Sequence, residues 1–139
     1  MRVIVDTSVW SFAFRRRAKS LSRPERALTL LLRDLIVAGD PISPGVVRQE
    51  LLTGIRDPST FDALRNRLHD FDDLPPEIDD YERAAEFGNV CTRAGIAATT
   101  VDMLICAMAA SRGLPILTTD DDFKLYARHL PIKLHPHSG

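Results

Sequence analysis

The chain has 139 residues, a length that favours one domain with a sizeable hydrophobic core. Hydrophobic residues make up 45% and charged residues 27%, and the net charge of −1 excludes a global field that would draw the chain to a polyanion or a membrane. No apolar stretch approaches the ~20 residues of a membrane span, and Asp6 interrupts the apolar N-terminus, so we expect no signal peptide and a cytoplasmic protein.

Apolar periodicity predicts short strands and amphipathic helices along the first half of the chain. A basic cluster over residues 15–19 falls in the first loop, where it is either a solvated connection or a contact for nucleic acid. The predicted elements are a strand over 2–5, a helix over 7–14, a helix from 24 that Gly39 ends, a strand over 40–43, a helix over 44–54, a helix from 58 whose apolar stripe includes Phe71, and a weak strand over 70–74.

The second half continues the alternation and contains the most apolar helix, over residues 99–112. Because this helix has hardly any polar face, we expect it to be buried. A helix over 77–94 precedes it, and a strand over 115–118, a helix over 120–129, a strand over 131–134 and a flexible tail over 135–139 follow. The order predicts one α/β domain over residues 1–139, with a mainly parallel sheet of four to five short strands covered on both faces.

The two cysteines, Cys91 and Cys106, fall inside apolar helical patterns and have no CxxC or Cys/His spacing. That spacing fits neither a metal site nor a redox motif. We therefore interpret both as reduced core residues, with a disulfide as the less favoured alternative.

Four carboxylates are notable for their positions, and each also has an ordinary explanation. Asp6 and Asp120 each follow a predicted strand, where ligands bind in open α/β sheets, yet either side chain can simply cap the next helix. Glu50 can be an exposed helical glutamate. Asp102 is the only charge before a long apolar stretch, and with Thr99 it has the spacing of a capping box.

The spread of these carboxylates along the chain suggests a shared site, because residues at strand ends can converge above one edge of a sheet. Close carboxylates repel each other and either take up protons or bind a hard cation. Oxygen-only ligands favour Mg²⁺ or Mn²⁺ over zinc, and such a cluster suits metal-assisted attack of water on a phosphodiester. The residues alone therefore suggest a metal-dependent nuclease, on the condition that the four side chains meet.

The order of these motifs resembles that of PIN-domain ribonucleases, in the short form of the VapC toxins. The resemblance covers Asp-Thr-Ser after the first strand, Glu before Leu-Leu-x-Gly, an Asp in a late buried helix, and Leu-Thr-x-Asp-x-Asp-Phe after a late strand. It implies an α/β/α sandwich and an Mg²⁺- or Mn²⁺-dependent endoribonuclease, the toxin of a type II toxin–antitoxin system. It also implies an RNA substrate, a homodimer, and a VapB-type antitoxin that blocks the acidic site within a hetero-oligomer.

The resemblance also assigns roles to particular residues. Four acids match the family's catalytic and metal-binding positions: Asp6, Glu50, Asp102 and Asp120. Asp122 matches a nearby acid that assists, and which member of the run 120–122 faces the metal stays open. Further candidates are the hydroxyls that could orient a carboxylate or a water, and the arginines that could bind RNA phosphates: Thr7, Ser8 and Thr118, and Arg15, Arg16 and Arg17.

Two other classes of protein remain open at this point. A PIN-fold nuclease could act in RNA processing without a toxin role. A non-enzymatic, Mg²⁺-binding receiver-like signalling domain would need paired acids after the first strand and a Lys that ends a late strand. Here the first site is a single Asp followed by Thr and Ser, and Lys133 lies inside the predicted last strand.

Overall fold

The computed structural model describes residues 1–14 and 20–137 of the chain. Within these ranges the strands form a single parallel sheet in the order β3-β2-β1-β4. The strands are β1 (Val3–Val5), β2 (Pro41–Pro44), β3 (Asp72–Leu74) and β4 (Ile116–Leu117). The helices are α1 (Thr7–Phe14), α2 (Arg23–Val37), α3 (Gly45–Leu52), α4 (Pro58–Leu68), α5 (Ile78–Arg93), α6 (Thr100–Arg112) and α7 (Asp122–Ala127).

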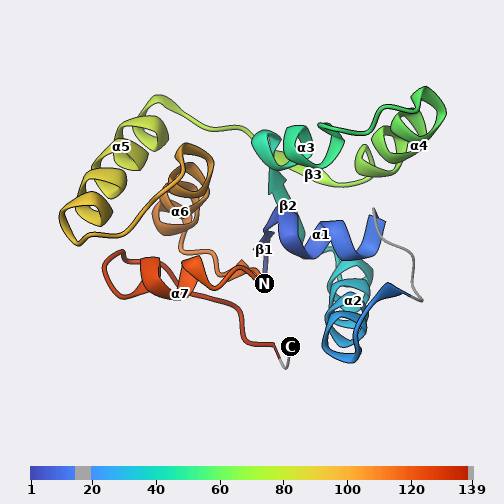
Figure 1. Ribbon diagram of the computed structural model, residues 1–139, viewed down its shortest axis with the longest axis horizontal. Helices are drawn as coiled ribbons and strands as arrows, with labels where there is room; N and C mark the ends of the chain where they lie inside the picture. Colours follow the sequence, from blue (N-terminus) through green and yellow to red (C-terminus); the bar gives the residue numbers. More distant parts are fainter. Residues whose placement is uncertain (15–19, 138–139) are drawn as a thin grey trace.

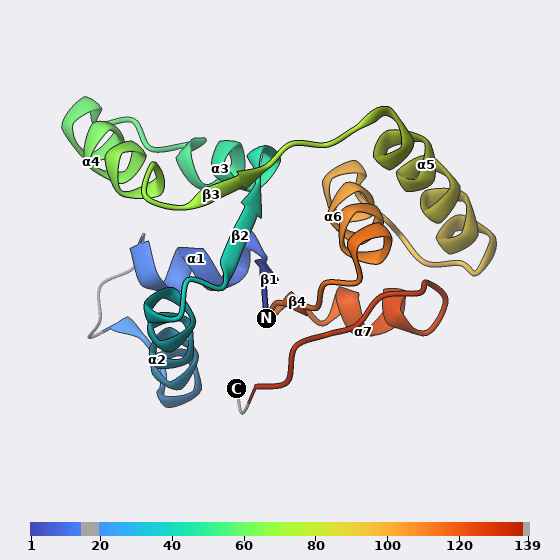
Figure 2. The same ribbon diagram turned by 180° about the vertical axis from the view of Figure 1, so that it is seen from behind.

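Helices flank the sheet on two sides, as expected for an α/β/α sandwich. Figure 1 shows α1, α2, α3 and α4 on one side of the strands and α5, α6 and α7 on the other, and the view from behind agrees (Figure 2). Both faces of a parallel sheet must be covered because its strands are apolar on both sides. The predicted fold class is therefore confirmed, with a sheet of four strands.

The order in which the strands are added to the sheet reverses at β1. The chain runs outward from β1 to β2 and β3, and then returns to place β4 on the free side of β1. The register pairs Ile4 with Ile42 on one side and with Ile116 on the other. The carboxyl ends of β1 and β4 thus form a topological switch point, the place where open α/β sheets bind their ligands.

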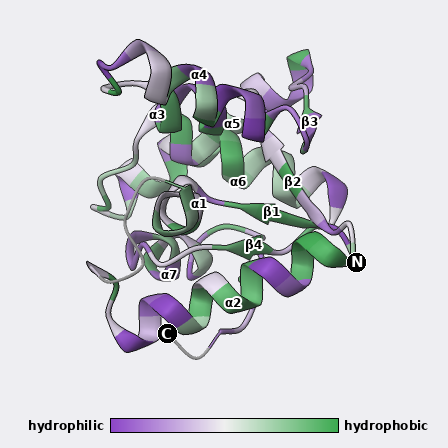
Figure 3. Cartoon of the chain, turned by 90° about the vertical axis from the view of Figure 1, so that its right-hand side faces the viewer, coloured by the Kyte–Doolittle hydropathy of each residue, from purple (hydrophilic) through white to green (hydrophobic). Residues whose placement is uncertain are grey.

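The core is built from the central strands and from α6. The three residues of β1 are at most 2% exposed, and the residues of α6 from Met103 to Ala109 are all buried. Figure 3 shows β1 and β4 in green, whereas α2 carries both green and purple residues as expected for an amphipathic helix. The predicted burial of the helix over 99–112 is confirmed.

Trp10 anchors α1 to the sheet. Its ring is 1% exposed, and its indole Nε1 donates hydrogen bonds to the carbonyl oxygen of Val5 at 3.1 Å and to the hydroxyl of Ser43 at 2.7 Å. Because these partners lie at the carboxyl ends of β1 and β2, they fix the first turn of α1 beside those ends. This turn contains two of the predicted hydroxyl residues, Thr7 and Ser8.

Two sequence predictions of secondary structure are wrong in detail. The expected strand over 131–134 reduces to a single bridge between Leu134 and Ile116. The helix that starts at Pro58 ends at Leu68, so Phe71 lies outside it and packs its ring against Trp10, with the ring centroids 4.8 Å apart. Tertiary contact with an aromatic ring decides the position of Phe71, and helical periodicity cannot reveal such a contact.

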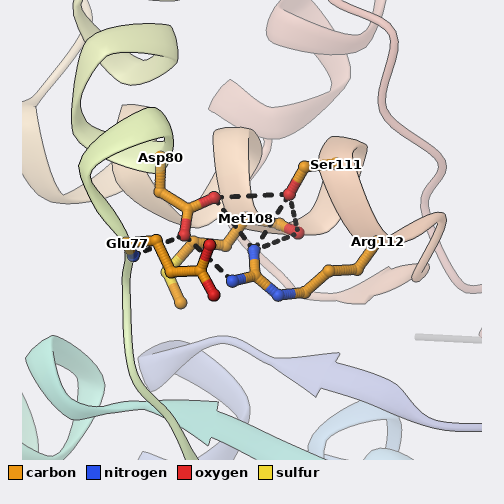
Figure 4. A network of polar contacts seen from close by, with 5 residues as sticks. All are labelled: Glu77, Asp80, Met108, Ser111 and Arg112. Carbon is orange, nitrogen blue, oxygen red and sulfur yellow. Dashed lines mark hydrogen bonds and ion pairs between the residues drawn. The ribbon is translucent and has the colours of Figure 1, made fainter.

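A partly buried ion pair joins the start of α5 to the end of α6 (Figure 4). The guanidinium of Arg112 donates two hydrogen bonds of 2.9 Å, one to each carboxylate oxygen of Asp80. The same carboxylate accepts hydrogen bonds from the backbone N–H of Glu77 at 2.8 Å and from the hydroxyl of Ser111 at 3.3 Å. The Arg112 guanidinium lowers the pKa of Asp80 below its ordinary value, so the pair is ionised at neutral pH.

Candidate active site

Asp6 lies at the switch point and is only 5% exposed. Its backbone N–H continues the ladder to β4 with a hydrogen bond of 2.9 Å to the carbonyl oxygen of Leu117. One carboxylate oxygen, Oδ2, accepts hydrogen bonds from the hydroxyls of Ser8 at 2.8 Å and Thr118 at 2.9 Å. The interpretation of Asp6 as a helix cap has limited support, because the backbone N–H of Ser8 lies 3.5 Å from the same oxygen.

Thr7 links the first strand end to α3. Its hydroxyl donates a hydrogen bond of 2.8 Å to Oε1 of Glu50, whose side chain projects from the solvent-exposed part of α3. Because Thr7 directly follows Asp6, its hydrogen bond to Glu50 places the two acids in the same region. Glu50 is an exposed helical glutamate, and this does not exclude a role in the site, because an exposed residue of a helix can face the site.

Asp102 sits in the first turn of α6, which Thr99 caps. The Thr99 hydroxyl accepts a hydrogen bond of 3.1 Å from the backbone N–H of Asp102, which is the Thr99 half of the predicted capping box. The Asp102 side chain itself turns elsewhere, because its Oδ2 accepts a hydrogen bond of 3.0 Å from the Tyr126 hydroxyl on α7. Thr99 therefore caps the helix through the backbone N–H of Asp102, while the Asp102 carboxylate remains available to a site.

The acidic run over residues 120–122 begins just beyond β4. The backbone N–H of Asp120 donates to the Thr118 hydroxyl at 3.0 Å, and its Oδ1 accepts a hydrogen bond of 2.9 Å from the backbone N–H of Asp122. Asp121 points to solvent and pairs with Lys124 at 3.2 Å, with 87% of its side chain exposed. Within this run, Asp120 is held closest to the switch point by its bond to Thr118, and Asp122 acts through its backbone.

Geometry and electrostatics together relate three of these carboxylates: the Thr118 hydroxyl donates to Asp6 and accepts from the backbone N–H of Asp120, and both negative charges act on Asp102. The pKa of Asp102 is raised to about 6, mainly by burial; the negative charges of Asp6 and Asp120 contribute to the rise, and the hydrogen bonds from Tyr126 and Thr99 oppose it. Like charges raise each other's pKa only when they are close. The three aspartates, from the ends of β1, α6 and β4, therefore form one acidic cluster.

The acidic cluster has no cationic partner within the protein segments that the structure describes. No Lys or Arg of residues 1–14 and 20–137 forms an ion pair with Asp6, Glu50, Asp102 or Asp120. Over the same residues, no three His, Cys, Asp or Glu side chains are gathered tightly enough to hold an ion as they stand. The uncompensated charge and the all-oxygen donor set fit a hard divalent cation, whose binding would have to draw the side chains together.

Burial and negative charge affect two further side chains beneath the cluster. Burial raises the pKa of the Tyr126 hydroxyl well above its ordinary value, and the charge of Asp102 adds to the effect. Burial likewise raises the pKa of the Cys106 thiol, with a contribution from Asp102. Both groups therefore stay protonated at neutral pH. Cys91 and Cys106 are free and buried, as predicted.

Tyr126 also belongs to this region, although it was not among the residues predicted from the sequence. Apolar spacing in α7 predicts only that its ring is buried, and the ring is 1% exposed. The contact with Asp102 spans 24 positions of the chain, and no local pattern signals it. The predicted RNA contacts Arg15, Arg16 and Arg17 lie outside the described residues.

The described part of the C-terminal segment runs past the end of β4. The backbone N–H of His135 donates to the carbonyl oxygen of Ile116 at 2.8 Å, and Nε2 of His137 lies 2.9 Å from the carbonyl oxygen of Thr118. A pocket of about 450 Å³ lies between this segment and the acidic run, lined among others by Asp120, Lys124 and both histidines. This pocket adjoins the acidic cluster through Asp120.

A parallel α/β domain with carboxylates gathered at its switch point is the architecture of a PIN domain. The sequence model of the PIN domain matches residues 3–129, so the chain belongs to the PIN domain family. Ribonuclease VapC6 of Mycobacterium tuberculosis is 34% identical over 87 residues, which are 60% of this chain and 68% of that protein. This family assignment decides against the receiver-like alternative.

Solved structures share the fold over nearly the whole chain. FitAcB from Neisseria gonorrhoeae matches with a TM-score of 0.72 and 19% identity, over 96% of both chains. VapBC2 from Rickettsia felis, bound to a DNA fragment from their promoter, matches with a TM-score of 0.73 and 15% identity, over 97% of this chain and 98% of that one. At such identities these structures establish the fold alone. No helix within residues 1–14 and 20–137 is long and apolar enough to cross a membrane.

Proposed function

We propose that this protein is the toxin of a type II toxin–antitoxin system, an endoribonuclease that hydrolyses RNA phosphodiester bonds with the help of a divalent cation, Mg²⁺ or Mn²⁺. The observation that carries the proposal is the acidic cluster of Asp6, Asp102 and Asp120 at the switch point of a PIN domain, which forms no ion pair with a Lys or Arg of residues 1–14 and 20–137. The similarity to a ribonuclease of the VapC family supports the choice of RNA as substrate.

The carboxylates have distinct parts in this proposal. Asp6, Asp102 and Asp120 would hold the cation, and Asp122 would support Asp120 through the hydrogen bond from its backbone N–H. When bound, the cation would supply a polarised water and would stabilise negative charge on the phosphate oxygens. Without it, the cluster would repel the phosphates of RNA, because both carry negative charge.

Glu50 has a different environment from the three aspartates. It is exposed, and the Thr7 hydroxyl donates a hydrogen bond to its Oε1, so Oε2 would be its reactive oxygen. In that position it would orient the attacking water and accept a proton from it. Ser8 and Thr118 would hold Asp6 in place through their two hydrogen bonds to Oδ2.

The partners follow from the same assignment. We propose a cognate VapB-type antitoxin, a homodimer in solution and a toxin–antitoxin hetero-oligomer, with the RNA substrate met in the cytoplasm. Support comes from the solved complexes of VapBC proteins that share the fold. Arg15, Arg16 and Arg17 remain candidates for contacts with RNA phosphates on sequence grounds alone.

A cleavage assay with purified protein tests the enzymatic proposal. We expect cleavage of total RNA in Mg²⁺ or Mn²⁺, loss of cleavage in EDTA, and loss in the Asp6→Asn and Asp102→Asn variants. Asp121→Asn is the matched control, because Asp121 is an aspartate of the same region that points to solvent. Full cleavage by both site variants would refute the assigned site.

A growth experiment separates the toxin from a nuclease of RNA processing. Induced expression of the toxin should arrest growth, and co-expression of a small neighbouring open reading frame should relieve the arrest. Mapping of RNA ends after induction, with Asp102→Asn as control, would then identify the substrate. Metal-dependent cleavage without growth arrest would favour the role in RNA processing.

A further inference from the structure

We propose that Tyr126 is a positioning residue of the cation site, which fixes Asp102 so that its Oδ1 faces the cation. This inference rests on the proposed function, because it assumes that Asp102 is a ligand. It adds a residue of α7 that the matched motifs do not contain.

The first observation is a shared pattern among the four carboxylates. On each of them, one carboxylate oxygen is identified as the acceptor of a hydrogen bond from the protein. The contacts are Ser8 and Thr118 to Oδ2 of Asp6, Thr7 to Oε1 of Glu50, Tyr126 to Oδ2 of Asp102, and the backbone N–H of Asp122 to Oδ1 of Asp120. In this proposal the second oxygen of each of the three aspartates meets the cation, while that of Glu50 acts on the attacking water. Tyr126 does for Asp102 what Ser8 and Thr118 do for Asp6.

The second observation is that the Tyr126 ring cannot move freely. The side chain is 1% exposed, and it packs edge to face against Phe123, with the ring centroids 5.3 Å apart at an angle of 72°. Phe123 is itself fully buried. A hydroxyl on an immobile ring sets the direction of its hydrogen bond, so the 3.0 Å contact with Oδ2 selects one orientation of the Asp102 carboxylate.

The third observation concerns the backbone of Asp102. The Thr99 hydroxyl holds its N–H at the start of α6, while the Tyr126 hydroxyl holds the head of its side chain. Fixed at both ends, the carboxylate has little rotational freedom to lose when a cation binds. Removal of the Tyr126 hydroxyl would release one end only.

Binding of Mn²⁺ to the full chain without RNA tests the proposal, by titration calorimetry and by the electron paramagnetic resonance signal of the free ion. We expect Tyr126→Phe to bind Mn²⁺ about tenfold more weakly, the lower part of the 10–100-fold range for residues that orient metal ligands. The ring and its packing remain, so the variant should fold. Tyr81→Phe is the matched control, because Tyr81 is the other tyrosine of the chain and is 56% exposed on α5.

The outcomes separate this proposal from the proposed function. Weaker binding in Tyr126→Phe with unchanged binding in Tyr81→Phe supports the positioning role. An affinity within twofold of the wild type overturns it, even if the melting temperature falls, because the hydroxyl then has a structural role only. Equal losses in both variants also overturn it. Absence of Mn²⁺ binding by the wild type would remove the cation site itself, and the positioning role with it.

Discussion

Arg112 and Asp80 form a two-pronged ion pair that ties the end of α6 to the start of α5. The two side chains are 24% and 5% exposed, and both nitrogen–oxygen distances are 2.9 Å. Asp80 carries no signal of this role in the sequence beyond its place in the first turn of a predicted helix. The pair holds α6 from its C-terminal end, while its N-terminal end presents Asp102 to the acidic cluster.

Removal of one partner of this pair should destabilise the protein strongly. In Arg112→Leu the Asp80 carboxylate stays buried without its counter-charge, and we expect a loss of about 3–5 kcal/mol in the free energy of unfolding. Urea unfolding measures the loss. Arg65→Leu is the control, because Arg65 pairs with Asp62 on the surface and its removal should cost about 1 kcal/mol or less. Similar losses in both variants would contradict the structural role of the buried pair.

Asp102→Asn should abolish cleavage and yet stabilise the protein in the absence of metal. The folded state raises the pKa of Asp102 to about 6, so at neutral pH the ionised carboxylate is costly there, and this cost develops as the pH rises from about 4 to 6. An amide removes the cost. Calorimetry at pH 7.5 in EDTA should show a higher melting temperature, by about 4 °C for each kcal/mol gained.

The stability gain of Asp102→Asn should depend on pH in a defined direction. Below about pH 4 the wild-type carboxyl is protonated in both states, so the gain over the wild type should vanish there. Above pH 6 the gain should be constant. A gain that increases towards acid pH would show that burial does not disfavour the charge of Asp102.

Cleavage at limiting metal should fall as the pH drops through about 6. A protonated Asp102 cannot serve as a metal ligand. Because burial raises its pKa, Asp102 stays protonated up to a higher pH than an ordinary aspartate does. More metal should move the midpoint of the profile to lower pH, because cation and proton compete for the same carboxylate. Initial rates of RNA cleavage at several concentrations of Mg²⁺ check this expectation. A midpoint that does not move with Mg²⁺ would argue against Asp102 as a ligand.

The two cysteines should be inert in the native protein. Cys91 and Cys106 are both buried, and burial raises the pKa of each thiol, so little thiolate forms at neutral pH. A thiol reagent such as Ellman's reagent should label neither residue in buffer and both in guanidinium. Mass spectrometry would identify labelled peptides. Rapid labelling of Cys106 in the native state would contradict the close packing of α6.

The sequence by itself determined the order of the elements and the residues that bear charge at their ends. Apolar runs and helix-starting prolines locate most elements to within a few residues, because the period of burial is a local property. Four acids in the order of a known family suggested a nuclease site. Even the caps that seemed to compete with that site proved compatible with it, as Thr99 and Asp102 illustrate.

Only the tertiary structure decided which side chains meet. The reversal of strand order at β1 places Asp6 beside Thr118, 112 positions away, and the packing of α7 against α6 brings the Tyr126 hydroxyl to Asp102. Phe71 lies outside the helix predicted for it and packs against the rings of Trp10 and Phe14. These contacts depend on how helices and strands pack across the sheet. Residue spacing along the chain reports the faces of each element but carries no information on which faces come together.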